Sequence, residues 1–223
     1  MSADERLVCP LEHRYGSIEM RTIFSNENIL RKRLQVEVAL AYGLAAAGFI
    51  SFEEAKKIEE ASAKVKLERI EELEKVLGHD IMALATSLAE AAESFGRGVH
   101  LGATSYDIVD TAWALIFRDA LKIVKSKLKS ILSMLMEYSK RYEDLMMVGR
   151  THGQHALPIT LGFKFANYVY ELSRSLERIV ESEKRLIRGK LSGAVGTMAA
   201  WGNKGLVVEA EALKRLGLKP HVI

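Results

Sequence analysis

The 223-residue sequence predicts an all-α protein: a small N-terminal helical domain followed by long helices of a bundle. Three observations predict this class. Apolar residues recur with the helical period, serine and glycine stand at the expected helix ends, and two segments keep the period beyond ~25 residues. No segment shows the alternation of a strand, so we expect none. We place the domain boundary after Gly98, giving domains of residues 1–98 and 99–223.

The N-terminal domain is predicted from its helix start and stop signals. Ser25 is expected to cap the first long helix, and the sequence SFEE at residues 51–54 has the capping-box pattern that opens the next helix. A third helix covers residues 67–77 and stops at Gly78. Asp80 is expected to cap a fourth helix, because a carboxylate can accept the unpaired amides of a first turn.

Two long helices form the second domain. The first runs from Tyr106 to about Tyr142 and the second from Thr160 to about Leu191. At a rise of 1.5 Å per residue the first would be roughly 55 Å long. Two such helices do not bury their apolar faces on each other alone, since bundles normally need about four. We expect the remaining helices to come from other copies of the chain or from sequence beyond it.

Composition and charge limit the kinds of binding partner that we expect for this protein and the cellular compartment in which we expect it. The net charge of +3 is mild, and acidic and basic residues are interleaved, so no nucleic-acid partner is expected. The apolar run from Val38 to Ile50 is too short to span a bilayer, and the N-terminus lacks the pattern of a signal peptide. Cys9 is the only cysteine, which excludes an intrachain disulfide. We therefore expect a cytoplasmic protein without a membrane partner.

The segment between the two long helices carries the most chemistry. Residues 149–158 read GRTHGQHALP, and the glycines and Pro158 predict a loop at which the helix stops and then restarts. Thr151, His152 and Gln154 lie within it. Loops on a rigid scaffold often hold catalytic groups, and histidine exchanges a proton near neutral pH. This segment is the main candidate for a catalytic site.

The histidines allow more than one interpretation. All six fall in predicted breaks, at His13, His79, His100, His152, His155 and His221. A single loop histidine is usually just solvated, but four of them beside glycine and a hydroxyl or carboxylate favour a functional cluster. The spacing of His152 and His155 does not match a zinc motif. His79 followed by Asp80 is by itself a weak signal, so a metal site is the less favoured interpretation.

Two further groups remain ambiguous from the sequence alone. Thr104 and Ser105, with Asp107, either cap the first long helix or bind a substrate carboxylate at its positive end. Arg14 and Tyr15 are either an anion contact or an exposed arm. The glycines after residue 192 do not follow a strand, so they do not predict a nucleotide-binding fold.

Five segments of the sequence resemble the fumarase/aspartase superfamily, and within it the adenylosuccinate lyases, and they occur in the same order as in that family. His79-Asp80 and the continuation DTA at residues 110–112 point to that family rather than to argininosuccinate lyases. The matching segments are Arg14-Tyr15-Gly16, GHDI at residues 78–81, VHLGATSYD at 99–107, GRTHGQ at 149–154 and GAVGT at 193–197.

The resemblance implies β-elimination of fumarate from adenylosuccinate, giving AMP, and from the succinylaminoimidazole carboxamide ribotide (SAICAR), giving AICAR. It implies a homotetramer whose active sites are built from three subunits, without a cofactor. It assigns His152 as general acid and His79 and His100 as groups that contact and orient the substrate. The residues it implies in substrate binding are Arg14 and Tyr15 for the phosphate, Thr104 and Ser105 for the succinyl group, and Gly78, Asp80, Thr151 and Gln154.

The chain also departs from that family. Many members have a basic residue in place of Gly78 and Asn or Thr in place of Tyr106. The family continues for roughly as many residues again, a length that fits a multi-helix bundle, and that part holds the flexible loop with a catalytic serine base. Two other hypotheses therefore remain: a non-catalytic helical assembly module, and a lyase relative that acts on another succinylated substrate.

Overall fold

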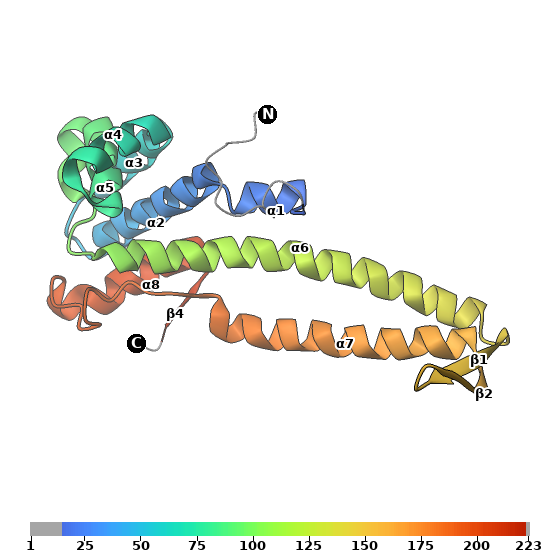
Figure 1. The fold of residues 1–223 in the computed structure, drawn as a ribbon. Coiled ribbons are helices and arrows are strands. Elements are labelled where there is room, and N and C mark those ends of the chain that lie inside the picture. The colour runs from blue at the N-terminus through green and yellow to red at the C-terminus, as the bar shows by residue number, and fades with distance from the viewer. Residues whose placement is uncertain (1–14, 222–223) are drawn as a thin grey trace. The chain divides into compact units, whose positions relative to one another are not determined.

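The structure is a computed structural model that describes residues 15–221. In that range it contains eight α-helices, which confirms the predicted helical class, together with two short strand pairs. Contacts divide the chain into two units (Figure 1). Unit 1 contains the described residues up to Asp119 and from Leu186 onward, and unit 2 is Ala120–Arg185. The predicted domain boundary after Gly98 stays a prediction.

Unit 1 begins with helices whose ends follow the predicted signals. The Ser25 hydroxyl accepts the Asn28 amide, and Ser51 and Glu54 form both hydrogen bonds of a capping box. Gly78 ends the fourth helix in the left-handed conformation, with φ of 66°. These helices are α1 (Ile18–Ile23), α2 (Asn26–Ala46), α3 (Phe52–Ser62), α4 (Leu67–Leu77) and α5 (Asp80–Ala92).

The predicted cap of α5 is wrong by one residue. His79, not Asp80, has the extended backbone of an N-cap, and its Nδ1 accepts the Met82 amide at 3.3 Å. Asp80 is already helical, so its carboxylate cannot reach forward in the same way. It accepts the neighbouring Ile81 amide instead and forms an ion pair with Arg33 at 3.1 Å.

Unit 1 also contains segments that precede and follow unit 2 along the chain. They are the 3₁₀ helix η1 (Glu93–Gly98), the first part of α6 (Ser105–Arg141), β3 (Arg188–Gly189), η2 (Gly202–Lys204), α8 (Gly205–Leu216) and β4 (Lys219–Pro220). β3 and β4 pair in parallel.

The core of unit 1 consists of two apolar clusters that share α2. One cluster contains Leu40, Leu115 and Leu213, from α2, α6 and α8, and the other fills the space among α2, α3 and α5. α2 approaches α8 closely because Gly43 lacks a side chain that would collide with the Val208 carbonyl. Burial of these side chains fixes the elements that carry the site described below.

Unit 2 contains the rest of α6, then β1 (Met146–Thr151), β2 (Gln154–Thr160) and most of α7 (Leu161–Leu186). Lys125 of α6 forms an ion pair with Glu183 of α7 at 2.6 Å. At the other end of α7, the Ser139 hydroxyl donates to the Gly162 carbonyl at 3.0 Å. These contacts tie the two helices together along their length.

The expectation of a loop without strands between the long helices is wrong. β1 and β2 form an antiparallel hairpin, and the two residues at its turn, His152 and Gly153, have φ of 52° and 70°. Positive φ at both positions is typical of a type I′ turn, which fits the twist of a hairpin. Pro158 lies within β2 opposite Val148, where a two-stranded ribbon tolerates a missing amide. This ribbon buries neither face, so its sequence carries no alternating pattern.

Among the described residues, no helix has the length and apolarity needed to cross a membrane.

Candidate active site

The connection before α6 holds His100 in a tightly fixed loop. His100 and Gly102 have φ of 56° and 75°, and the Ala103 amide donates to the His100 carbonyl at 3.2 Å. The indole Nε1 of Trp201 donates to the Leu101 carbonyl at 2.9 Å. A side chain at position 102 would collide with that indole, so glycine allows Trp201 to fix the loop.

His79 and Ser105 join the end of α4 to the start of α6. The Nε2 of His79 lies 3.3 Å from the Ser105 hydroxyl. Because Nδ1 of the same ring accepts the Met82 amide, the helix cap selects the tautomer with its proton on Nε2. In this tautomer His79 donates toward Ser105, and about half of the imidazole stays accessible to a ligand.

The imidazole of His100 contacts a buried carboxylate. Its Nδ1 lies 2.6 Å from Oε1 of Glu37, a residue of α2 whose side chain is 0% exposed. Burial lowers the pKa of His100, but the hydrogen bond and charge of Glu37 and the charge of Asp107 outweigh it and raise the pKa above its usual value. The imidazole is therefore biased toward its charged form.

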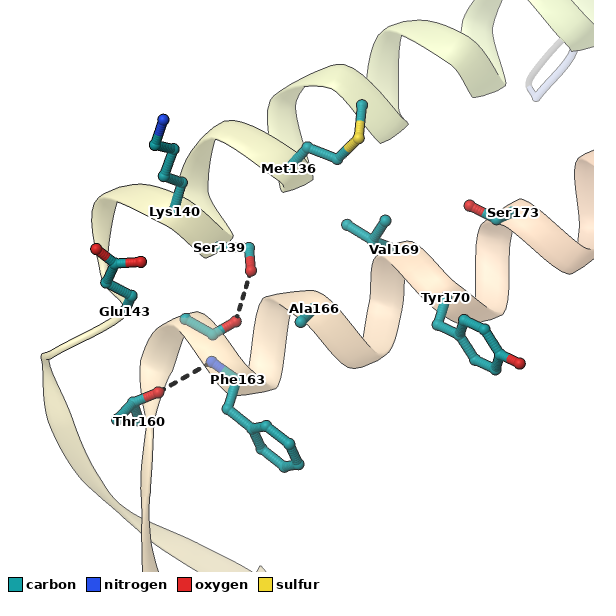
Figure 2. A pocket seen from close by; sticks show the side chains of 11 residues that line it. Met136, Ser139, Lys140, Glu143, Thr160, Phe163, Ala166, Val169, Tyr170 and Ser173 are labelled. Atoms are coloured by element: carbon teal, nitrogen blue, oxygen red, sulfur yellow. Dashed lines mark hydrogen bonds between the residues drawn. The ribbon is translucent and has the colours of Figure 1, made fainter.

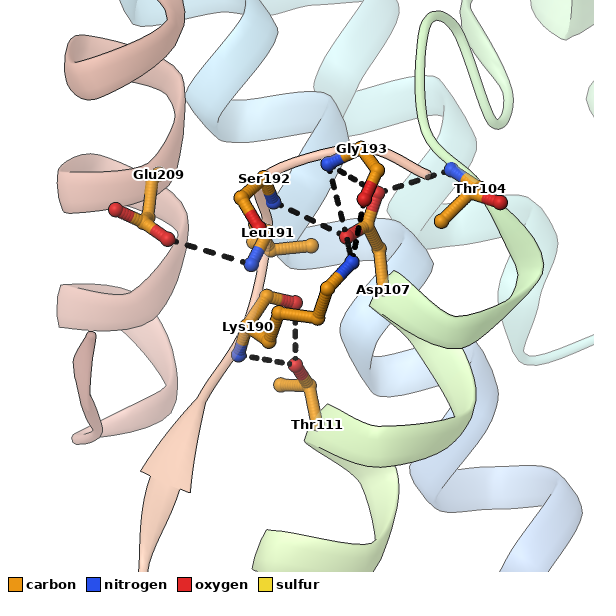
Figure 3. Close-up of polar contacts among 8 residues, drawn as sticks. All are labelled: Thr104, Asp107, Thr111, Lys190, Leu191, Ser192, Gly193 and Glu209. Atoms are coloured by element: carbon orange, nitrogen blue, oxygen red, sulfur yellow. Dashed lines mark hydrogen bonds and ion pairs between the residues drawn. The ribbon is translucent and has the colours of Figure 1, made fainter. Parts of the chain in front are cut away.

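Asp107 is the most heavily bonded side chain near the site (Figure 3). Its carboxylate is fully buried, pairs with Lys190 at 2.7 Å and accepts the amides of Thr104, Ser192 and Gly193. Through these bonds the start of α6 holds the segment that leads into GAVGT at residues 193–197. Asp107 thus fixes two of the motif segments against each other.

Glu209 on α8 is a second carboxyl group in this region, and its surroundings differ from those of Asp107. Burial, with the charge of Asp107, raises the pKa of Glu209, although the Leu191 amide and Lys190 oppose this rise. The Leu191 amide donates to its Oε1 at 3.4 Å (Figure 3). Glu209 is therefore more easily protonated than an ordinary surface glutamate.

The structure bears on the two interpretations of Thr104 and Ser105, which are helix capping and binding of a substrate carboxylate. Asp107 accepts the Thr104 amide at 2.9 Å, so this carboxylate closes the first turn of α6. Ser105 is the first helical residue, and its hydroxyl contacts His79 instead of acting as the cap. Both hydroxyl residues stand at the positive end of a 37-residue helix, where a carboxylate ligand is favoured.

Three other predicted residues have different surroundings. Gly78 has left-handed φ and no atom within 4 Å of the position that a side chain would take, so the helix end explains a glycine here, and the substrate contact implied for it stays a prediction. Tyr15 is 72% exposed in the turn before α1. Arg14 lies outside the described residues, so the phosphate contact implied for it stays a prediction.

In unit 2 the hairpin tip presents Thr151, His152 and Gln154. All three side chains are exposed, and the Thr151 hydroxyl lies 2.9 Å from Nδ1 of His152. The structure therefore places His79 against Ser105 and holds His100 in the loop that leads into Thr104 and Ser105 of unit 1. It brings the three hairpin residues together in unit 2.

Sequence reasoning missed Glu37 and Lys190. A signal for Glu37 was available, because it is the one acid within the apolar run from Val36 to Leu40 of a helix. A buried acid needs a partner. Lys190 carried no such signal, since its pairing with Asp107 joins residues 83 positions apart.

A groove of about 490 Å³ lies on unit 2 between α6 and α7 (Figure 2). Met136, Phe163, Val169 and Tyr170 line it, and none of the predicted site residues does. Its lining is mainly apolar and holds no histidine. Within residues 15–221 no group of three or more His, Cys, Asp or Glu side chains is placed to hold a metal.

A helical scaffold that places imidazoles and hydroxyls at the start of a long helix suits an enzyme that eliminates a carboxylate-bearing group. The chain belongs to the lyase family, whose model matches residues 16–222. Adenylosuccinate lyase from Pyrococcus abyssi is 47% identical over 96% of this chain and 48% of its own length. Adenylosuccinate lyase from Methanocaldococcus jannaschii is 45% identical over 100% of this chain and 49% of its own length.

A relative with a different printed activity also matches. N-acetyl-S-(2-succino)cysteine lyase from Enterococcus italicus is 40% identical over 96% of this chain and 47% of its own length. The chain thus spans about half the length of the curated relatives it matches. These matches confirm the predicted resemblance to adenylosuccinate lyases.

Solved structures agree with the fold. Fumarate lyase from Mesorhizobium sp. BNC1 superposes with a TM-score of 0.86 at 34% identity, over 92% of this chain and 49% of that one. β-Carboxy-cis,cis-muconate cycloisomerase from Acinetobacter calcoaceticus superposes with a TM-score of 0.88 at 31% identity, over 95% and 51%.

Proposed function

We propose that this chain is part of an adenylosuccinate lyase, which eliminates fumarate from adenylosuccinate to give AMP and from SAICAR to give AICAR. The observation that carries the proposal is the cluster of His79, His100, Thr104 and Ser105 in a chain whose relatives include adenylosuccinate lyases. A purely structural helical module would need none of these four side chains.

The proposed chemistry divides among the named residues. Elimination removes a weakly acidic proton from the succinyl group and expels a purine nitrogen, which must be protonated by a general acid. His152 is that acid in our proposal. Thr104 and Ser105 bind a carboxylate at the start of α6, and His79 and His100 orient the substrate. The base is a serine supplied by polypeptide outside this chain.

The other substrate contacts follow the family resemblance. Thr151 and Gln154 flank His152 on the hairpin and are proposed to contact the substrate with it. Asp80 is proposed to act at the edge of the His79 cluster, where it already pairs with Arg33. Arg14 and Tyr15 are proposed to bind the phosphate. No cofactor or metal is part of this mechanism.

We also propose a homotetramer in which other copies complete each site. Unit 2 buries few apolar side chains, and Met136 and Phe163 are 52% and 66% exposed along its groove (Figure 2). Helices of further copies of this chain would cover them, as in other bundles. Met136→Asp should lower the oligomeric state measured by light scattering, whereas Glu71→Gln on exposed α4 should not.

Mixing of inactive variants tests whether sites are shared. His100→Gln, through a raised KM, and His152→Asn, through a lowered kcat, are each expected to lose most activity at low adenylosuccinate concentration. If His100 and His152 of one site come from different copies, assemblies reconstituted from both variants contain some sites with both native histidines and regain activity. No recovery after reassembly would contradict a shared site.

The activity itself is tested by substrate profiling of the complete protein. Adenylosuccinate cleavage is followed by absorbance, with fumarate and AMP identified as products. The Enterococcus relative makes N-acetyl-S-(2-succino)cysteine the strongest competing substrate. Turnover of that thioether, of argininosuccinate or of fumarate with ammonia, without turnover of adenylosuccinate, would overturn the proposed function.

The leaving group offers a second discriminator. A thiol leaves as a thiolate near neutral pH, with a typical pKa of about 8.5, whereas a purine amine needs a proton. His152→Asn should therefore lower turnover of a nitrogen-linked substrate far more than that of a sulfur-linked one. Equal losses on both substrates would contradict the role of His152 as general acid.

A further inference from the structure

Glu37 is a buried acid that the proposed mechanism does not yet use. It lies in the middle of α2, its side chain is 0% exposed, and its Oε1 is 2.6 Å from Nδ1 of His100. Its second oxygen, Oε2, is buried without a hydrogen-bond partner among the described residues. His100 is therefore the only hydrogen-bonding partner that the described part of the chain provides for this carboxylate.

The physics of burial favours an ion pair at this contact. An ionised carboxylate removed from water requires an opposite charge, and a bare buried charge is strongly unfavourable. Two carboxylates act on the imidazole, Glu37 from α2 and Asp107 from α6. Asp107 already has Lys190 as its counter-ion at 2.7 Å. Among residues 15–221 Glu37 has no lysine or arginine partner, so a protonated His100 is the group that neutralises it.

The geometry leaves one ring nitrogen for a ligand. Glu37 occupies Nδ1, and the imidazole side chain keeps 21% of its surface exposed. The left-handed backbone of His100 and the Trp201 bond to Leu101 fix the loop that carries the ring. Nε2 is therefore the ring nitrogen that the Glu37 contact leaves for a ligand.

We propose that Glu37 is a positioning residue that holds His100 as an imidazolium, whose Nε2–H binds a carboxylate of the substrate. This inference rests on the proposed function, because it assigns a role to His100 within the same site. It makes His100 an anion-binding group and not a proton acceptor. His79 has a different contact, because its Nδ1 accepts the Met82 backbone amide.

A double-mutant cycle in the complete protein separates this role from a structural one. Glu37→Gln keeps a hydrogen-bond acceptor of similar size but removes the charge. Loss of one charge-assisted hydrogen bond to the substrate should raise KM for adenylosuccinate about tenfold to hundredfold, with a smaller change in kcat. His100→Gln should have an effect at least as large. The double variant should behave like His100→Gln alone, because Glu37 acts through His100.

Two kinetic results would contradict the role proposed for Glu37. If the two substitutions multiply in KM, or if Glu37→Gln lowers kcat and leaves KM unchanged, the proposal is overturned. Glu54→Gln is the control, since this glutamate belongs to the capping box of α3 and should leave KM unchanged. If Glu37→Gln does not fold alone, the double variant is expected to fold, because it removes both partners of the buried pair. Failure of the double variant to fold would assign Glu37 a structural role instead.

A chemical footprint tests the charge state without any turnover. Diethyl pyrocarbonate modifies the neutral imidazole, so modification of His100 at pH 7, followed by peptide mass spectrometry, should be faster in Glu37→Gln than in the native protein. His155, on the hairpin of unit 2, is the internal standard. Unchanged reactivity of His100 overturns the inference. Absence of adenylosuccinate cleavage by the native protein, with the expected footprint, overturns the proposed function alone.

Discussion

Unit 1 and unit 2 differ most in what they bury. Unit 1 has two apolar clusters with fully buried leucines on α2, α5, α6 and α8. The buried hydrophobic side chains of unit 2 are Ala120 and Leu132, each 7% exposed, while Phe163 and Tyr170 are 66% and 65% exposed. The comparison teaches that unit 1 is held by its own core. Unit 2 leaves an apolar surface exposed, and this is the surface that the proposed assembly would cover.

The same difference separates the two groups of candidate site residues. His79 and His100 are fixed by hydrogen bonds to Met82, Ser105 and Glu37 inside unit 1. His152 stands at an exposed turn, with Thr151 as its neighbour. Substitutions of His79 and His100 should therefore change stability and activity together, whereas substitutions at the hairpin tip should change activity with little effect on folding.

The largest expected effect is at the tip of the hairpin. His152→Asn in the complete protein should lower kcat by ~10²–10⁴, the usual loss when a general acid is removed. Asparagine is the appropriate replacement because it tolerates the positive φ of 52° at this position better than alanine does. The thermal midpoint should stay unchanged. Steady-state kinetics and calorimetry check both parts.

His155→Asn is the matched control for His152. It lies on β2 of the same hairpin, opposite Arg150, and is also exposed. We expect kcat within about threefold of native for this variant, since surface changes away from a site are usually small. A kcat near native for His152→Asn would remove His152 from the mechanism.

The next largest effect is expected inside unit 1, at Asp107. Asp107→Asn removes the fully buried charge that pairs with the half-buried Lys190, and breaking a buried ion pair costs about 3–5 kcal/mol. Urea unfolding should show this loss. Glu90→Gln, which breaks an exposed pair with Arg69, should cost only ~0–1 kcal/mol. Equal losses for the two variants would mean that the Asp107 network does not hold unit 1 together.

The two units also differ in how far their sequence predicts them. In unit 1 the caps at Ser25, Ser51 and Gly78 are local signals, and the structure confirms all three. The sequence predicts Asp80 as the cap of α5 because a carboxylate can accept the unpaired amides of a first turn, and only the backbone geometry shows that His79 takes that place. In unit 2 the hairpin gave no strand signal, since neither of its faces is buried.

The residues of the candidate site also differ in how far the sequence predicts them. Its histidines and hydroxyls stand out in the sequence because they interrupt helical patterns. Glu37 and Lys190 do not stand out as members of the site, because their partners are 63 and 83 residues away along the chain. Contacts of such long range depend on how the helices pack, and no local pattern encodes that packing.

A smaller effect is expected for the close approach of α6 and α7 in unit 2. A side chain at position 162 would meet the backbone of Ser139 and Glu143, so Gly162→Ala should cost about 1–3 kcal/mol. Gly153→Ala meets no atom within 4 Å but is strained by its φ of 70°, which costs about 1 kcal/mol. Chemical unfolding of both variants compares a packing cost with a backbone cost. A smaller loss at Gly162 than at Gly153 would mean that the two helices separate easily.

The smallest effect concerns pH and the framework of unit 1. The Ser51 amide, the Arg97 guanidinium and the Ser51 hydroxyl lower the pKa of Glu54 from its ordinary value of 4.5 to about 2. A group with a depressed pKa stabilises the folded state above its unfolded pKa and loses that contribution as pH falls through the folded value. Native stability should therefore decline between pH 4.5 and about 2. Glu54→Gln should flatten this decline in acid unfolding curves, and an unchanged curve would show that the capping box of α3 does not supply the acid sensitivity of unit 1.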